Sequence, residues 1–258
     1  ALQMFEVIYC KTPYHTDVAA VLCSLGFNYK TMRQCEKAEQ CYTRALAIYE
    51  KIHGTNSVHC DIASTISGLS YNYSVMGKYE LAASGYHRAL AMYEAIYGSN
   101  CNNKDIADTM HYIGCSHYYQ NEYEKAEEWT KKALLMYQGL RLDETNIKDV
   151  GLMLNNLGYF CNRMRRFDSA HTYLTKALEH FKIHRAGDHI SLAHTLDSLA
   201  EHYRDRHQLD KFHVTAREAL EMFKRLNPNH KRILVLESML QHDSECHFRS
   251  DRCSYPLM

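Results

Sequence analysis

The sequence predicts an all-α solenoid built from antiparallel helix pairs. The dipeptide Ala-Leu recurs at intervals of 44 residues through four copies, and the last copy follows after 42 residues. Apolar residues between these copies have helical spacing, and the chain holds only 3 prolines and 11 glycines. A period of this length is typical of helical repeats that complete their cores by stacking on their neighbours. The five copies are Ala45-Leu46, Ala89-Leu90, Ala133-Leu134, Ala177-Leu178 and Ala219-Leu220.

The first helix of each repeat is expected to begin at a capping residue, because Asp and Ser side chains accept hydrogen bonds from the free amides of a first turn. In the first repeat an apolar stripe follows, formed by Val18, Leu22 and Leu25. Gly26 comes next, and we expect it to allow a neighbouring helix to approach closely. The expected capping residues are Asp17, Asp61, Asp105, Asp149 and Ser191.

A short polar turn is expected to join the two helices of each repeat. Gly77 and Asn121 occupy the position after the first helix, where a left-handed backbone is favoured. The second helices are predicted to begin at Cys35, Tyr79, Tyr123, Phe167 and Leu209. Each has an aromatic residue three positions beyond the Leu of its Ala-Leu pair, which predicts a buried ring: Tyr49, Tyr93, Tyr137, Phe181 and Phe223.

These positions resemble the signature of the tetratricopeptide repeat (TPR) family. Leu25-Gly26, Tyr29, Ala38, Tyr42 and Ala45 match its leucine-glycine, tyrosine, alanine, aromatic and alanine at the usual offsets. His15-Thr16-Asp17-Val18-Ala19 and Leu154-Asn155-Asn156-Leu157 resemble the kinesin-light-chain and nephrocystin-like branch, and the repeats here have an extended length of 42 to 44 residues. The resemblance covers about residues 1–226. It implies a right-handed TPR superhelical solenoid.

The repeat divides the chain into eight expected segments. Residues 1–14 match the C-terminal part of the second helix of a preceding repeat, so the chain is expected to be cut from a longer array. Five TPR repeats are expected at 15–58, 59–102, 103–146, 147–188 and 189–228. Residues 229–242 are expected to form a capping helix and residues 243–258 a tail.

Composition argues against several classes of partner and compartment. The 30 basic and 30 acidic residues give zero formal net charge, whereas a nucleic-acid-binding protein usually carries a basic excess. No apolar run approaches the roughly 18 residues that span a bilayer, and no N-terminal leader is visible. The 10 cysteines lack CxxC spacing. We therefore expect reduced thiols, a cytoplasmic location, and neither a nucleic acid nor a membrane as partner.

The sequence predicts no catalytic residue, cofactor or metal site. It contains no phosphate-binding glycine loop, no nucleophile elbow and no HExxH motif. The strongest local cluster of histidines and cysteines, His242, Cys246, His247 and Cys253, fits no standard zinc spacing. His15 and His59 are interpreted as turn residues. A non-enzymatic chain without a cofactor is therefore expected.

The resemblance implies a concave groove, lined by the first helices, that holds a protein or peptide segment. Positions two before, two after and five after the Leu of the Leu-Gly pair are expected to face it. The candidate partner-binding residues from these positions are Phe27, Tyr71, His111, Tyr118, Asn155, Tyr159, Asn162, Asp197, Glu201 and Arg204. Lys and Arg are absent from the first two sets, which predicts that there is no carboxylate clamp.

The character of these residues predicts an extended or helical partner segment with apolar anchors. The acidic side chains of the fifth repeat would receive a basic end of that segment. Other interpretations stay open: the tyrosines could serve packing alone, and the acidic residues could form a solvated face. The array could instead be the sensor or autoinhibitory arm of a larger nucleotide-dependent signalling protein, or it could self-associate through its end faces.

Overall fold

The structure is a computed structural model that describes residues 14–55, 57–98, 101–140, 144–183 and 190–250. These residues form helices joined by turns, without a strand, so the all-α prediction is confirmed. None of the described helices is both long and apolar enough to cross a bilayer. The chain divides into two compact units, which we call unit 1 (residues 1–141) and unit 2 (residues 142–258).

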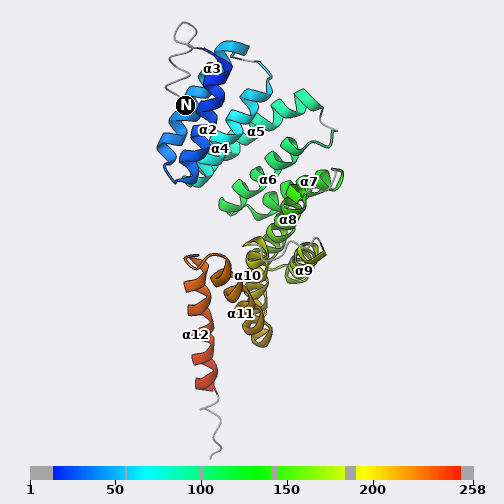
Figure 1. Ribbon diagram of the computed structural model, residues 1–258. Helices are drawn as coiled ribbons and strands as arrows, with labels where there is room; N and C mark the ends of the chain where they lie inside the picture. The colour runs from blue at the N-terminus through cyan, green and yellow to red at the C-terminus, as the bar shows by residue number, and fades with distance from the viewer. Residues whose placement is uncertain (1–13, 56, 99–100, 141–143, 184–189, 251–258) are drawn as a thin grey trace, which may run out of the picture. The chain divides into compact units, whose positions relative to one another are not determined.

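Unit 1 consists of three antiparallel helix pairs (Figure 1). The pairs are α2 (Thr16–Thr31) with α3 (Cys35–His53), α4 (Cys60–Val75) with α5 (Tyr79–Tyr97), and α6 (Lys104–Tyr119) with α7 (Tyr123–Gln138). The second helices of the first two pairs also contact the first helix of the next pair, α3 with α4 and α5 with α6. In addition α2 contacts α4, and α4 contacts α6. The first helices therefore form one continuous layer.

Unit 2 contains two helix pairs and a final helix. The pairs are α8 (Glu144–Arg163) with α9 (Phe167–Ile183) and α10 (Ile190–Asp205) with α11 (Leu209–Leu226), and α12 (Arg232–Ser250) packs against α11. Ile233 and Leu236 of α12 join the buried cluster formed by α10 and α11. The expected tail at 243–258 is wrong in its first part, because α12 continues to Ser250. Likewise α8 begins inside the segment assigned to 103–146.

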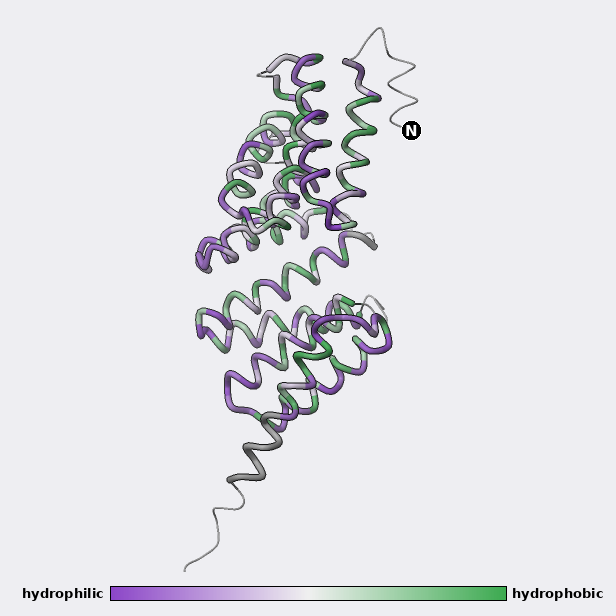
Figure 2. Tube along the Cα trace, turned by 90° about the vertical axis from the view of Figure 1, so that its left-hand side faces the viewer, coloured by the Kyte–Doolittle hydropathy of each residue, from purple (hydrophilic) through white to green (hydrophobic). Residues whose placement is uncertain are grey.

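The core follows the recurring positions of the sequence. The alanines of the five Ala-Leu pairs are completely buried, and the aromatic residues three positions beyond each Leu are buried with them, as predicted. All five second helices begin at the predicted residues. Hydrophobic and hydrophilic stretches alternate along the helices (Figure 2), as helices with one buried face require.

The turns inside the helix pairs share one left-handed residue. Gly77 and Asn121 have φ values of 76° and 62°, which confirms their predicted role. Arg33, Arg165 and His207 adopt the same conformation at the equivalent positions, with φ values of 58°, 58° and 57°. This conformation costs a non-glycine residue roughly 1–2 kcal/mol. The packing of the paired helices therefore fixes the turn even where the residue does not favour it.

The predicted capping residues are wrong, because each helix starts earlier than expected. The caps of α2, α4 and α6 are His15, His59 and Asn103. The Nδ1 atom of His15 accepts a hydrogen bond from the backbone N–H of Asp17 at 3.2 Å, and His59 does the same for Asp61. Asp17, Asp61 and Asp105 lie in the first turn, where their charge still favours the helix dipole. Asp149 lies within α8, and Ser191 is the second residue of α10.

Two glycines allow Tyr42 of α3 to lie against both first helices of the first two repeats. A Cβ atom at Gly26 would be 3.0 Å from the Tyr42 ring, and one at Gly68 would be 2.8 Å from it. The close approach expected at Gly26 is therefore confirmed, with the tyrosine ring of a second helix as its neighbour. Because Gly68 has no side chain, the Tyr42 ring can lie directly against α4 as well.

A candidate partner-binding hollow on the first helices of unit 1

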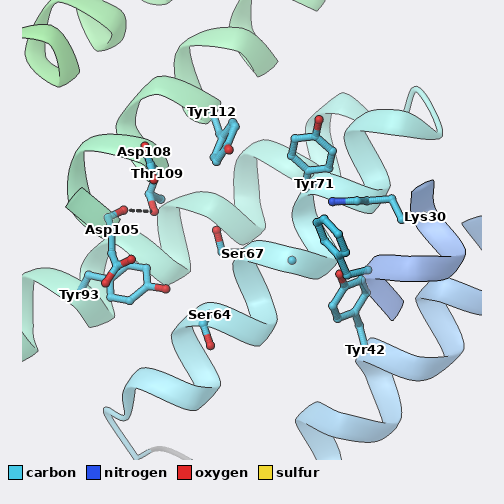
Figure 3. Close-up of a pocket in the computed structure, with 12 residues that line it drawn as sticks. Lys30, Tyr42, Ser64, Ser67, Tyr71, Tyr93, Asp105, Asp108, Thr109 and Tyr112 are labelled. Carbon is cyan, nitrogen blue, oxygen red and sulfur yellow. Dashed lines mark hydrogen bonds between the residues drawn. The ribbon is translucent and has the colours of Figure 1, made fainter. Parts of the chain in front are cut away.

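A hollow of about 360 Å³ lies over the first helices of unit 1. Figure 3 shows side chains from several helices around it, with Ser64 and Ser67 in the middle and the rings of Tyr93, Tyr112, Tyr71 and Tyr42 around them. Its lining residues are Phe27, Lys30, Tyr42, Ser64, Ser67, Gly68, Tyr71, Tyr93, Asp105, Asp108, Thr109 and Tyr112. We call this feature the aromatic hollow.

Two helical faces make most of the aromatic hollow. The lining residues of α4 are Ser64, Ser67, Gly68 and Tyr71, and those of α6 are Asp105, Asp108, Thr109 and Tyr112. Each set has the spacing i, i+3, i+4 and i+7, so its members lie on one side of their helix. Three of the four residues on α4 are small, which leaves space above that helix for a ligand.

One end of the aromatic hollow carries a cation between two rings. The Lys30 ammonium lies 4.5 Å from the ring centroid of Phe27 and 4.0 Å from that of Tyr71. Partial burial lowers the pKa of Lys30. Phe27 is 54% exposed and Tyr71 is 37% exposed, so both rings offer apolar area to a partner. This end therefore combines exposed aromatic surface with a positive charge.

Contacts with other rings hold Tyr71 and Tyr112 in place. Their centroids lie 5.5 Å apart with an interplanar angle of 82°, an edge-to-face arrangement. Tyr112 also stacks on the buried Tyr86 at 5.4 Å. Burial raises the pKa of Tyr86 well above its usual range, so its hydroxyl stays neutral. The rings that a ligand would meet are therefore ordered before it binds.

The other end of the aromatic hollow is acidic. Asp105 is exposed, and the hydroxyl of Tyr97 donates to its Oδ2 atom at 3.5 Å. Asp108 accepts hydrogen bonds from the Lys104 ammonium at 3.4 Å and from the Tyr137 hydroxyl. Burial, followed by the charge of Asp105, raises the pKa of Tyr93 above its usual range. The aromatic hollow thus has opposite charges at its two ends.

The structure brings together only part of the predicted site in unit 1. Phe27 and Tyr71 line the aromatic hollow. His111 and Tyr118 lie on α6 but outside the lining: His111 Nε2 is 3.7 Å from the Cys115 sulfur, and Tyr118 packs edge-on against Tyr119. These two residues are half-buried.

In unit 2 the expected exposure of Asn155, Asn162 and Asp197 is wrong. They are only 8%, 7% and 6% exposed. The physical reason is that α8 and α10 contact each other directly, so positions expected to face a groove lie between neighbouring helices or against other side chains. Tyr159, Glu201 and Arg204 are half-buried.

Asn162 belongs to a polar network inside unit 2. Its side-chain nitrogen donates to Asp205 Oδ2 at 2.6 Å, so its oxygen accepts from Nδ1 of His202 at 2.9 Å. His202 is 1% exposed, and its ring stacks on His171 at 5.5 Å. Burial, followed by the nearby His171 and Arg206, lowers the pKa of His202 to about 4. His202 is therefore neutral in the folded protein at neutral pH.

This lowered pKa predicts a loss of stability in mild acid. The unfolded His202 has an ordinary pKa of 6.5 and gains a proton as the pH falls from about 6.5 toward 4, while the folded form does not. The unfolded state then binds more protons, so the free energy of unfolding should fall through this window. In urea titrations between pH 7 and pH 4.5, His202→Gln should show a flatter pH dependence than the natural chain. An equal dependence in both proteins would contradict the assignment.

The acidic residues expected to receive a basic partner end already have an internal cation. Arg232 of α12 donates from Nε and Nη2 to the two carboxylate oxygens of Asp197, each at 2.6 Å. Its Nη2 also donates to Glu201 Oε1 at 2.6 Å. Burial alone would lower the pKa of Arg232, but the hydrogen bonds to the two carboxylates and their charges raise it. The pKa of Glu201 is raised, chiefly by burial. The basic end expected over the fifth repeat is thus supplied by this chain.

Sequence reasoning missed most of the residues that line the aromatic hollow. Tyr93 was predicted to be a buried ring and Tyr42 was matched only to the aromatic position of the TPR signature; both are buried, yet both also line the hollow. Asp108 and Tyr112 lie outside the three offsets used to predict the groove. The signal that could have found them is the complete i, i+3, i+4, i+7 face of each first helix.

Comparisons with known proteins agree with this architecture. Two sequence models of the family described as Tetratricopeptide repeat match the chain, one at residues 61–139 and 149–225 and the other at residues 18–59. No curated protein sequence matches the chain.

Several solved structures have a similar fold. BtubC (BKLC) from P. vanneervenii is 20% identical with a TM-score of 0.70, and the match covers 89% of each chain. A kinesin light chain protein with TPR-like repeats from Podosopora anserina is 14% identical with a TM-score of 0.65, covering 83% of this chain and 98% of that one. The apo form of the quorum sensor NprR from B. thuringiensis is 13% identical with a TM-score of 0.73, covering 92% and 62%. With the family models matching well over half of its length, the chain belongs to the tetratricopeptide repeat family.

Proposed function

We propose that this protein is a non-enzymatic scaffold that holds a segment of a partner protein in the aromatic hollow of unit 1. Repeat arrays of this kind use the surface of successive helices as an extended binding face. The observation that carries the proposal is the set of exposed, ordered rings between a lysine at one end and aspartates at the other. Such a surface suits a peptide segment in which an apolar side chain stands next to charged ones.

The chemistry of the lining indicates what the partner segment contains. Apolar or aromatic side chains would pack on Phe27, Tyr71 and Tyr112, since rings supply contact area at low cost in conformational entropy. A basic side chain would lie near Asp105, and a carboxylate or carbonyl oxygen would lie near Lys30. Within unit 2, the half-buried Tyr159 and Arg204 stay as candidate contacts for a partner of that unit.

The cytoplasm is the compartment we propose. Seven cysteines among the described residues are in the reduced form, without a disulfide bond. Free thiols persist in reducing compartments and tend to become oxidised elsewhere. The cysteines thus favour a cytoplasmic protein over a secreted one.

The binding proposal can be tested with a phage-displayed library of random peptides panned against the full chain. Enriched peptides should carry an aromatic or large apolar residue a few positions from a lysine or arginine. In isothermal titration, Tyr71→Ala should weaken binding of such a peptide by about 30-fold, the loss of about 2 kcal/mol expected of a central aromatic anchor. Asp105→Asn should weaken it less, with an effect that shrinks as salt is added.

Tyr119→Ala is a matched control for the anchor variant. Tyr119 is an exposed tyrosine on α6 that stacks on Tyr79 at 4.6 Å but does not line the aromatic hollow. Its replacement should leave the affinity within about twofold of the natural chain, because the side chain is outside the proposed contact. Equal losses in Tyr71→Ala and Tyr119→Ala, or no loss in either, would refute the assignment of the hollow.

A further inference from the structure

The junction between the first two repeats carries a cluster of metal-binding side chains that the proposed function does not use. His53 is the last residue of α3, His59 is the N-cap of α4, and Asp61 lies in the first turn of α4. One ligand atom from each of the three lies within 4.8 Å of the other two, and all three residues are half-buried. From this geometry we propose that His53, His59 and Asp61 bind a divalent transition-metal ion such as Zn²⁺.

Two of the three separations between the ligand atoms are those of a tetrahedral site, and the third, between the two imidazole nitrogens, is within 4.8 Å. Asp61 Oδ2 lies 3.6 Å from His53 Nε2 and 3.4 Å from His59 Nδ1. Two ligands that each lie about 2.0–2.2 Å from a tetrahedral zinc ion are about 3.4 Å apart. The carboxylate oxygen is therefore already at nearly the correct distance from both nitrogens. Three protein ligands would leave the fourth position to water.

The His53 nitrogen has an incomplete environment without an ion. Nε2 is buried, and no hydrogen-bond partner within the described residues contacts it. Its 3.6 Å separation from Asp61 Oδ2 is longer than a hydrogen bond. A buried, unpaired nitrogen costs free energy, and a metal ion on that lone pair would remove the cost. The centroid of the His53 ring lies 6.1 Å from that of Tyr49 and 3.6 Å from that of His59, so the two imidazoles are already neighbours.

Binding an ion requires two small adjustments. The two imidazole rings are nearly parallel, with an interplanar angle of 13°, so one must turn for both lone pairs to converge on one ion. His59 Nδ1 must also release the N–H of Asp61, a capping hydrogen bond of 3.2 Å. The bond given up is long and neutral, whereas the bonds formed are metal–nitrogen bonds. The ion would then join the end of one repeat to the start of the next.

The ligand set determines which ions fit. Two imidazoles with one carboxylate suit Zn²⁺, Cu²⁺ or Ni²⁺, whereas Mg²⁺ and Ca²⁺ prefer a set made of oxygen atoms. The next repeat junction in unit 1 has cap residues with the same backbone conformations, Gly98 like Gly54 and Asn103 like His59, but different chemistry. There Tyr97 ends α5, Asn103 caps α6, and Asp105 accepts from the Tyr97 hydroxyl. That junction lacks imidazole ligands and provides an internal comparison.

Isothermal titration of the full chain with ZnCl₂ at neutral pH tests the site, with thermal unfolding as a second readout. His59→Asn is the decisive variant, because asparagine caps α6 at the equivalent position and so keeps the cap while removing a ligand. We expect a saturable Zn²⁺-binding event in the natural chain that weakens at least tenfold in His59→Asn and in His53→Tyr. Zn²⁺ should raise the Tm of the natural chain but not that of either variant, and Mg²⁺ should have no effect.

Two further variants separate this site from zinc binding at other histidines. His15→Asn removes the histidine cap of α2, and zinc binding should be unchanged. The double variant Tyr97→His/Asn103→His places the same ligand types around Asp105, and it should add a second binding event. The proposal fails if His59→Asn and His53→Tyr bind Zn²⁺ as the natural chain does, since the ion would then be held elsewhere. It also fails if the natural chain shows no saturable Zn²⁺ binding.

Discussion

Replacing Arg232 with alanine is expected to lower the free energy of unfolding by about 3 kcal/mol, because a buried carboxylate is left without its cation. The side chain of Asp197 is only 8% exposed, and Arg232 donates two hydrogen bonds to it and one to Glu201. Without the guanidinium, both carboxylates stay shielded from water with no positive charge to compensate them. Urea denaturation followed by far-ultraviolet circular dichroism measures the loss.

Lys231→Ala is the matched control for this change. Lys231 is the exposed neighbour of Arg232 in the sequence, and its loss should change stability by no more than about 0.5 kcal/mol. Trp129 of α7 is the only tryptophan and lies in unit 1, so its fluorescence separates a loss in unit 2 from a loss in the whole chain. Arg232→Ala with unchanged stability at pH 7 would show that the ion pairs contribute nothing measurable.

The Arg232→Ala defect should become smaller as the pH is lowered from 7 to 5. Burial already raises the pKa of Glu201, and the loss of the neighbouring cation raises it further in the folded variant. The folded state then binds more protons than the unfolded state as the pH falls through this range, which stabilises it. The quantity to compare is the difference in stability between the variant and the natural chain at each pH, since other groups titrate equally in both.

Phe181→Ala should cost about 3–5 kcal/mol, the range for removing a fully buried aromatic ring. Phe181 is 1% exposed, and its ring lies so close to Gly151 that a Cβ atom there would come within 2.3 Å of it. The ring therefore fills the space that the glycine leaves. Ile183→Ala serves as the control, because Ile183 is on the same helix but 74% exposed. A cost below about 1 kcal/mol would show that the site collapses around the missing ring.

The contact between Phe181 and Gly151 can be tested from both sides. Gly151→Ala alone should cost about 1–3 kcal/mol by overpacking, since the added methyl group meets the ring. Combining it with Phe181→Leu removes part of the clash, so the double variant should lose less stability than the sum of the two single variants. Strict additivity would contradict direct packing.

The helix pairs could be predicted well from the sequence. The same packing contacts recur in every repeat, so the residues that make them recur at a fixed interval. The starts of the second helices, the buried alanines and the left-handed position in the turns all follow from this period. The first-helix caps were mispredicted, because an aspartate recurs two positions after each true cap and offered a more regular pattern than His15, His59 and Asn103.

The candidate site was harder to predict, because it depends on contacts between repeats. Asn155 and Asn162 have polar side chains at positions where a groove was expected, yet the contact of α8 with α10 buries them. The pairing of Arg232 with Asp197 joins residues 35 positions apart in the sequence, which the repeat pattern does not reveal. Phe27 and Tyr71 were placed correctly on the first helices, whereas the aromatic hollow they line also requires rings from the second helices.

Tyr42 both packs between two repeats and lines the candidate site. Its buried ring lies against Gly26 and Gly68, which belong to adjacent first helices, and it also lines the aromatic hollow. A ligand that contacts this ring would therefore act directly on the packing between the first two helix pairs. If the aromatic hollow binds a partner as proposed, the stiffness of the contact between the first two helix pairs should differ between the empty and the occupied protein.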